Sequence, residues 1–160
     1  MKISIVGLGN AWATDDGVGP AVIRALQSKE MPVQHQFSLF TLSYAAPELL
    51  DYMQGCELLI LIDAVYSGQK PGTVHCHRWQ PNLLAERGIE RVSMHGLGVA
   101  DMLSLAQVLQ QLPPCVVLWG VEVASTRPGP DLSPLVARAV PVVATKIHRQ
   151  LTKNKPCPSF

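Results

Sequence analysis

Two hydrophobic patterns alternate along the chain. Short segments rich in Ile, Val and Leu predict strands at residues 2–6, 37–42, 58–62 and 115–121. The segment 58–62 is continuously apolar, which is typical of a central strand with helices on both faces of its sheet. Apolar residues at helical spacing predict helices at residues 18–26, 45–53 and 99–110. Alternating strands and helices with short connections predict an α/β protein with a mostly parallel sheet.

The C-terminal part of the chain predicts a further helix. Ser133 and Pro134 are typical of a helix start, because Ser caps free N–H groups and Pro has no N–H to lose in the first turn. Pro141 should break or kink this helix, since Pro cannot donate the helical hydrogen bond. The helix should resume over residues 142–151, and residues 152–160 are expected to form a flexible tail.

Residues 73–79 predict a strand with two different faces. Its alternating faces are Val74, Cys76 and Arg78 on one side, and His75, His77 and Trp79 on the other. We expect this strand to be the antiparallel edge of the sheet. His75 and His77 together could hold a metal ion, but His residues on an edge strand more often face solvent and prevent pairing with other chains. We therefore expect both to be solvent-facing and remote from the active edge.

These elements predict a single domain over residues 1–160. Its architecture is a three-layer, open, mostly parallel sheet with helices on both faces and an antiparallel edge strand. A chain of this length can bury about 70% of its unfolded surface in one core. In open α/β sheets, ligands bind outside the carboxyl ends of the strands, so chemistry is expected at that edge.

Charge and hydropathy exclude two classes of partner. Thirteen Lys and Arg against 12 Asp and Glu give a net charge of +1 without a strongly basic stretch, so nucleic-acid binding is not expected. The longest apolar stretches are far shorter than the roughly 20 residues of a membrane-spanning helix. The N-terminal segment lacks the apolar core and cleavage site of a signal peptide, so a cytoplasmic location is expected.

Three side chains of metal-ligand type lie in loops marked by Gly. Asp16 follows the first strand, Asp63 ends the third, and His95 precedes the helix at 99–110. We expect them to converge at the carboxyl edge, with Asp16 and His95 in surface loops. Carboxylate oxygen and imidazole nitrogen both suit first-row divalent metals. Taken singly, each has a simpler interpretation: Asp16 as a helix cap, Asp63 in an Asx turn, and His95 as a capping or packing residue.

Other catalytic and nucleotide-binding motifs are incomplete or missing in the sequence. Gly7 and Gly9 follow a strand as in a dinucleotide-binding turn, but Trp12 takes the place of the third Gly. Asp15 and Asp16 would also repel a phosphate there. The chain contains neither G-x-S-x-G nor G-K-[ST], so nucleotide binding, serine-hydrolase and P-loop chemistry are not expected.

The chain resembles the hydrogenase maturation endopeptidase family in four segments, GLGNAWATDDGVGPAVIRAL, IDAVYSGQKPGTV, SMHGLGVADML, and LWGVE followed by LSPLVARAVP. The resemblance extends from Ile3 to about Leu151, and its most specific part is G-x-G-N…D-[DE]-G-x-G. Members of this family clip a C-terminal extension from the large subunit of a nickel-iron hydrogenase after metal loading, and they have an open α/β fold. The resemblance thus implies a metal-gated endopeptidase whose partner is the hydrogenase large-subunit precursor.

The resemblance also implies residue roles. The family's metal-contacting acid in the first loop matches Asp16, the acid at the third strand matches Asp63, and the family's His matches His95. These three are therefore expected to be both the metal ligands and the catalytic groups. The first acid is often Glu in this family, so Asp16 reaches one methylene less far. Nickel arrives with the substrate, and another divalent ion can occupy the site in isolated protein.

Two alternatives stay open from the residues. Peptide hydrolysis needs an activated water and a polarised carbonyl, and a divalent ion can supply either. Alternatively, one Asp acts as general base while the metal only positions the substrate. A non-hydrolytic nickel-binding maturation chaperone or scaffold would use the same three ligands, with an affinity that falls as His95 becomes protonated.

Overall fold

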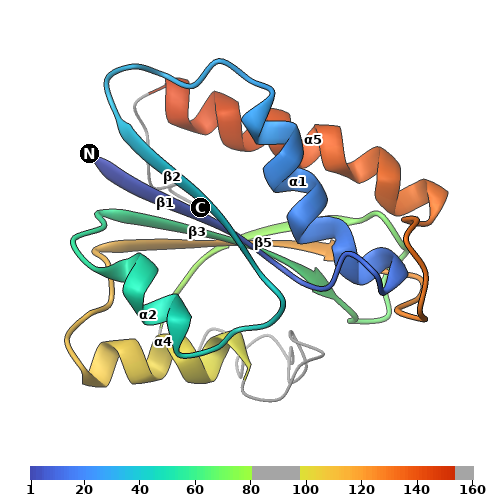
Figure 1. Ribbon diagram of the computed structural model, residues 1–160, viewed down its shortest axis with the longest axis horizontal. Coiled ribbons are helices and arrows are strands. Elements are labelled where there is room, and N and C mark those ends of the chain that lie inside the picture. Colours follow the sequence, from blue (N-terminus) through green and yellow to red (C-terminus); the bar gives the residue numbers. More distant parts are fainter. Residues whose placement is uncertain (81–97, 154–160) are drawn as a thin grey trace.

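The computed structural model describes residues 1–80 and 98–153. They form a five-stranded sheet with helices packed on it (Figure 1). The strands are β1 (Lys2–Leu8), β2 (Gln36–Leu42), β3 (Leu58–Val65), β4 (Val74–Arg78) and β5 (Cys115–Glu122). Their order in the sheet is β2-β1-β3-β5-β4. The first four of these are parallel, and β4 pairs antiparallel with β5 at the edge. The predicted α/β architecture with an antiparallel edge strand is confirmed.

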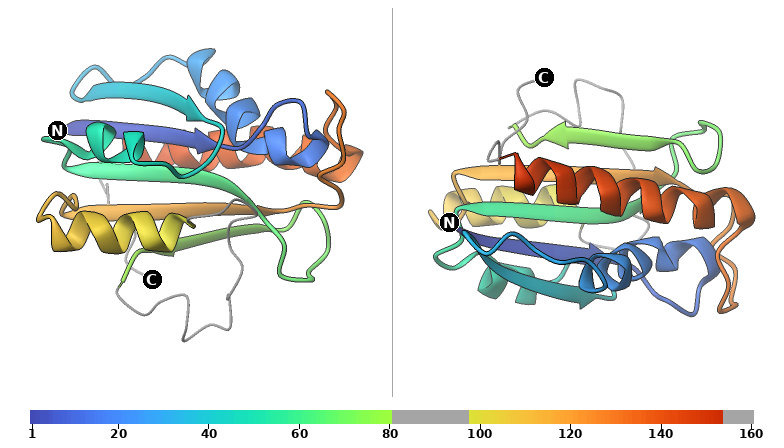
Figure 2. Two further views of the ribbon diagram at one scale, coloured as in Figure 1. Left: turned by 60° about the horizontal axis from the view of Figure 1, so that its bottom comes forward. Right: turned by 90° about the horizontal axis from the view of Figure 1, so that it is seen from above.

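Helices lie on both faces of this sheet, as Figures 1 and 2 show. The helices in the described residues are α1 (Val18–Gln27), α2 (Glu48–Met53), α4 (Val99–Val108) and α5 (Pro134–Thr152). α1 and α5 cover one face, and α2 and α4 cover the other (Figure 1). None of these helices is long and apolar enough to cross a membrane.

Consecutive residues of β3 pack into two different hydrophobic cores, one on each face of the sheet. Ile60 and Ile62 belong to the core under α1 and α5, whereas Leu59 and Leu61 belong to the core on the α2 and α4 side. All eight residues of β3 are buried. Because both faces of the strand are covered, the sequence of this segment is continuously apolar rather than alternating.

The expected break at Pro141 is wrong, since α5 runs as one helix through this residue. Pro141 is on the exposed side of the helix, where water can bind the carbonyl that has lost its helical partner. Val136 before it and Val143 after it are both fully buried in the same core. Packing on both sides of Pro141 therefore holds the two parts in one helix.

Candidate functional site

Asp63 lies inside β3 on the face that carries α2 and α4. The strand continues to Val65, so Asp63 does not end the strand as expected, and the simpler interpretation of Asp63 as an Asx-turn residue is also wrong. It pairs with Gly120 of the neighbouring strand β5. Its position two residues beyond Leu61 places it on the same face as Leu61, at the carboxyl edge where ligands bind in such sheets.

Two glycines bring the first loop close to this edge. Gly9 has a φ of +124°, and a Cβ there would lie 1.9 Å from the backbone oxygen of Asp16. A Cβ at Gly19 would lie 2.2 Å from the oxygen of Leu8 and 2.8 Å from that of Ile62. Because neither glycine has a side chain, the 3-10 helix η1 (Thr14–Gly17) and the start of α1 pack directly onto the ends of β1 and β3. This packing explains the Gly-rich segment without a bound nucleotide.

Asp16 is buried, with 1% of its side chain exposed, and the expectation that it lies on a surface loop is wrong. Its Oδ2 accepts a hydrogen bond from the backbone N–H of Asn10 at 2.7 Å. Asn10 is outside any helix, and the N-cap of α1 is Gly17. The interpretation of Asp16 as a helix cap is therefore also wrong. Close packing around Gly9 has buried this carboxylate.

Few hydrogen bonds stabilise the negative charge of the buried Asp63 carboxylate. Its Oδ1 accepts the N–H of Ala64 at 2.8 Å, whereas its Oδ2 is buried without a hydrogen-bond partner in the described part of the chain. Burial raises the pKa of Asp63 from 3.8 to about 8; the Ala64 hydrogen bond lowers it, and the charge of Asp16 raises it. Two buried carboxylates that repel each other are compensated by a cation or a shared proton. This donor pair fits a divalent metal ion.

His95, the third expected ligand, lies outside the described residues. The structure therefore brings together two of the three expected site residues, Asp16 and Asp63. No group of three or more His, Cys, Asp or Glu within residues 1–80 and 98–153 is arranged to hold a metal ion. The three-residue metal site therefore stays a prediction. Of its residues, the structure describes Asp16 and Asp63.

Asp15 has a structural role that the sequence did not reveal. It is fully buried, and its carboxylate accepts the backbone N–H groups of Ala124 at 2.9 Å, Ser125 at 3.2 Å and Ser133 at 2.6 Å. The hydroxyl of Ser133 donates a fourth hydrogen bond at 2.9 Å. These bonds fasten the loop between β5 and α5 to the loop that contains Asp16.

Glu122 is a further buried acid that was not predicted from the sequence, and it ends β5 at the same edge. It is 0% exposed and accepts hydrogen bonds from the N–H and the hydroxyl of Ser67. The Nε2 of His75 lies 3.1 Å from its Oε1. His75 on β4 is thus half-buried and within hydrogen-bonding distance of Glu122, so its expected solvent-facing role is wrong. The sequence carried a signal for Glu122, because it is an ionisable residue that directly follows a run of apolar residues, as Asp63 does.

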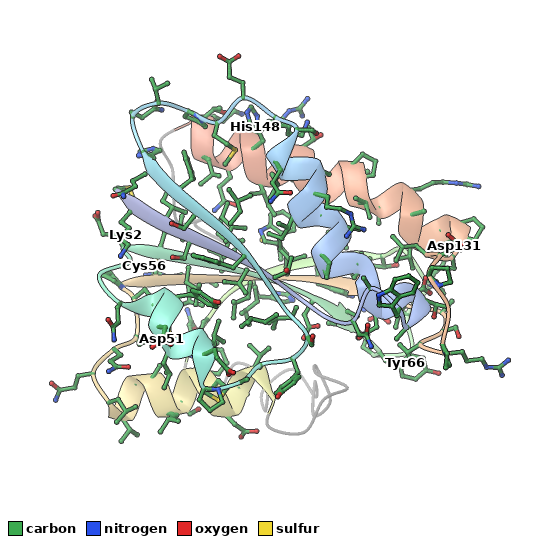
Figure 3. The ribbon with its side chains drawn as sticks, in the orientation of Figure 1. Lys2, Asp51, Cys56, Tyr66, Asp131 and His148 are labelled. Carbon is green, nitrogen blue, oxygen red and sulfur yellow. The ribbon has the colours of Figure 1, made fainter. Side chains whose placement is uncertain are left out.

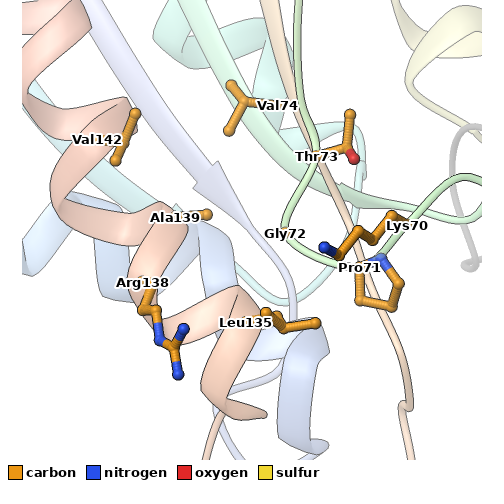
Figure 4. Close-up of a pocket in the computed structure, with 9 residues that line it drawn as sticks. All are labelled: Lys70, Pro71, Gly72, Thr73, Val74, Leu135, Arg138, Ala139 and Val142. Carbon is orange, nitrogen blue, oxygen red and sulfur yellow. The ribbon is translucent and has the colours of Figure 1, made fainter.

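A hollow of about 330 Å³ lies on the face of the sheet opposite to Asp63, between the turn before β4 and helix α5 (Figure 4). Lys70, Val74, Leu135 and Arg138 are among its lining residues. Val74 packs against the core under α1 and α5, whereas Asp63 is on the other face of the sheet. This hollow is therefore separate from the acid pair.

Comparisons with known proteins show which family the chain is similar to. A family model described as "Hydrogenase maturation protease" matches residues 20–150. The chain is 31% identical over 139 residues to the Hydrogenase 2 maturation protease of Escherichia coli, covering 85% of this chain and 82% of that protein. It is 26% identical over 152 residues to the hydrogenase expression/formation protein HupD of Rhodobacter capsulatus, covering 94% and 71%.

Solved structures give the same result. The hydrogenase maturating endopeptidase HybD from E. coli superposes with a TM-score of 0.79 at 28% identity, covering 96% of this chain and 93% of that one. The [NiFe] hydrogenase maturation protease HybD from Thermococcus kodakarensis superposes with a TM-score of 0.73 at 25% identity, covering 94% and 99%. Both similarities extend over nearly the whole chain.

Proposed function

Because the chain belongs to the hydrogenase maturation protease family, we propose that it removes the C-terminal extension of a nickel-iron hydrogenase large-subunit precursor after nickel insertion. Its family makes it a peptidase. The observation that carries the finer proposal is the buried pair of Asp16 and Asp63, in which Asp63 Oδ2 lacks a hydrogen-bond partner among the described residues. No observation favours the alternative of a non-hydrolytic nickel chaperone.

The acid pair has two tasks in this proposal. Asp16 and Asp63, together with His95, bind nickel that is already seated in the precursor, and this contact holds the scissile peptide beside them. Positioning of this kind supplies the proximity part of catalysis. Asp63, whose burial raises its pKa to about 8, can also hold a proton at Oδ2 near neutral pH. Activation of the water by nickel and activation by an Asp both remain compatible with this geometry.

The experiment compares precursor purified with nickel and precursor purified without it. Each is mixed with the protein in chelator-treated buffer, and the product is followed by electrophoresis and intact mass. A shorter product only from nickel-loaded precursor supports the proposal. Equal cleavage of both precursors contradicts nickel gating, and binding without any cleavage contradicts the endopeptidase function.

A further inference from the structure

Three exposed aromatic side chains lie at the same edge of the sheet as the acid pair. Trp12 is 72% exposed, Tyr44 54% and Tyr66 64%. They lie in the segments that follow the carboxyl ends of β1, β2 and β3, respectively. No other Phe, Trp or Tyr side chain in residues 1–80 and 98–153 is exposed. Exposed aromatic side chains are therefore confined to one edge of the described structure, and this edge carries Asp16 and Asp63.

The sheet order makes these three positions neighbours. Strands β2, β1 and β3 are adjacent in the sheet, so their carboxyl ends follow one another in the order Tyr44, Trp12, Tyr66. With strands about 4.8 Å apart, the three strand ends span about 10 Å. Trp12 shares its loop with Asp16, and Tyr66 directly follows the strand that contains Asp63. Figure 3 shows Tyr66 at the end of the molecule opposite Lys2.

Hydrogen bonds hold the backbone at Trp12 and next to Tyr66. The N–H of Trp12 donates to Asn10 Oδ1 at 2.9 Å, and its carbonyl accepts the N–H of Gly129 at 2.9 Å. Tyr66 precedes Ser67, whose N–H and hydroxyl donate to the buried Glu122. Tyr44 is followed by Ala45, which is 2% exposed. A fixed backbone that presents an exposed aromatic side chain loses little freedom on binding.

We propose that Trp12, Tyr44 and Tyr66 form a docking surface for the folded hydrogenase large-subunit precursor, an inference that rests on the proposed function. A peptide that reaches Asp63 belongs to a macromolecule, and the rest of that macromolecule must cover the loops beside the acid pair. Trp and Tyr are the residue types that most often dominate the free energy of protein interfaces. Since all three side chains are exposed, they contribute little to the core, and binding accounts for their placement.

The test is the kinetics of nickel-loaded precursor with Trp12→Ala, Tyr44→Ala, Tyr66→Ala and the triple variant. We expect each single variant to raise KM about thirtyfold, the lower limit for an interface hot spot, with kcat within about twofold of wild type. The melting temperature should not change, because the side chains are exposed. Val33→Ala and Val108→Ala are matched controls, since these residues are 98% and 79% exposed but lie away from this edge. Both controls should keep the wild-type KM.

A parallel measurement of precursor affinity separates this inference from the proposed function. Normal affinity and normal KM in the triple variant, with wild-type cleavage intact, would overturn the docking surface and leave the peptidase function standing. Loss of affinity in the triple variant supports the docking surface even if wild type binds the precursor without cutting it. If sedimentation shows that wild type self-associates and the triple variant does not, the surface serves a second copy of this chain and the inference is wrong.

Discussion

Asp15 and Ser133 bind each other through two hydrogen bonds, although 118 positions separate them in the chain. Ser133 is the N-cap residue of α5, yet its hydroxyl makes no capping bond to that helix. It donates to Asp15 instead, at 2.9 Å. The start of the last helix is therefore fastened to the loop that also carries Asp16. Stability and site geometry are coupled at this point.

Asp15→Asn should destabilise the protein. An amide in place of the carboxylate cannot accept all four hydrogen bonds, and its NH2 group would face donors. We expect the free energy of unfolding to fall by about 2–4 kcal/mol, as for other broken buried charged networks. Urea unfolding measures this change. Ser133→Ala, which keeps the backbone donor, should cost only about 1 kcal/mol. Equal stability of Asp15→Asn and wild type would contradict the role given to Asp15.

Asp16→Asn should abolish or severely reduce processing while the fold remains. An Asn oxygen can still accept the N–H of Asn10, and the loss of charge removes repulsion from Asp63. His95→Ala should have the same effect on processing. Rates come from a precursor cleavage assay and stability from thermal unfolding. Normal processing by both variants would show that the site assignment is wrong.

Asp63 should make the stability of metal-free protein fall with rising pH. Burial raises its pKa from 3.8 to about 8, so between these values the folded state holds a proton that the unfolded state has released. The stabilising contribution is complete below about pH 4 and is lost as the pH rises through about 8. Asp63→Asn should lack this dependence and be more stable than wild type at pH 8. Chemical unfolding of both proteins from pH 5 to 8 tests this, and parallel curves would argue against it.

His75→Ala should lower the free energy of unfolding by about 1–3 kcal/mol, because it removes a donor from the buried Glu122. The folded variant should still process precursor at near the wild-type rate, since Asp16, Asp63 and His95 are intact. Processing by His77→Ala should also be near the wild-type rate. A loss of processing in His75→Ala comparable with that of His95→Ala would place the Glu122 cluster in the active site.

The local pattern of apolar and polar residues was sufficient to predict most of the fold. The segment 58–62 is apolar because both faces of β3 are covered, and this burial is visible in its composition. The antiparallel edge strand was visible from its two different faces. Pro141 was misinterpreted because packing of Val136 and Val143 overrides the local preference of Pro.

The candidate site was harder to predict than the fold. Asp16 and Asp63 follow from the rule that ligands bind at strand ends, but the burial of Asp16 depends on the close approach at Gly9. The bonds from Asp15 to Ser133 and from Glu122 to His75 join distant parts of the chain, and residue spacing carries no information on them. For Glu122, only the residue type pointed to a special role, because an acid stands at the end of an apolar strand.

The direction of β1 has a practical consequence for attaching the protein to a surface. Met1 precedes β1, whose seven residues carry the chain about 20 Å before the loop that contains Asp16. Lys2 and Tyr66 accordingly lie at opposite ends of the molecule (Figure 3). A linker joined to the amino terminus would therefore leave the carboxyl edge facing solution. Immobilised in this way on a sensor, the protein would present its acid pair and its aromatic side chains to an incoming precursor.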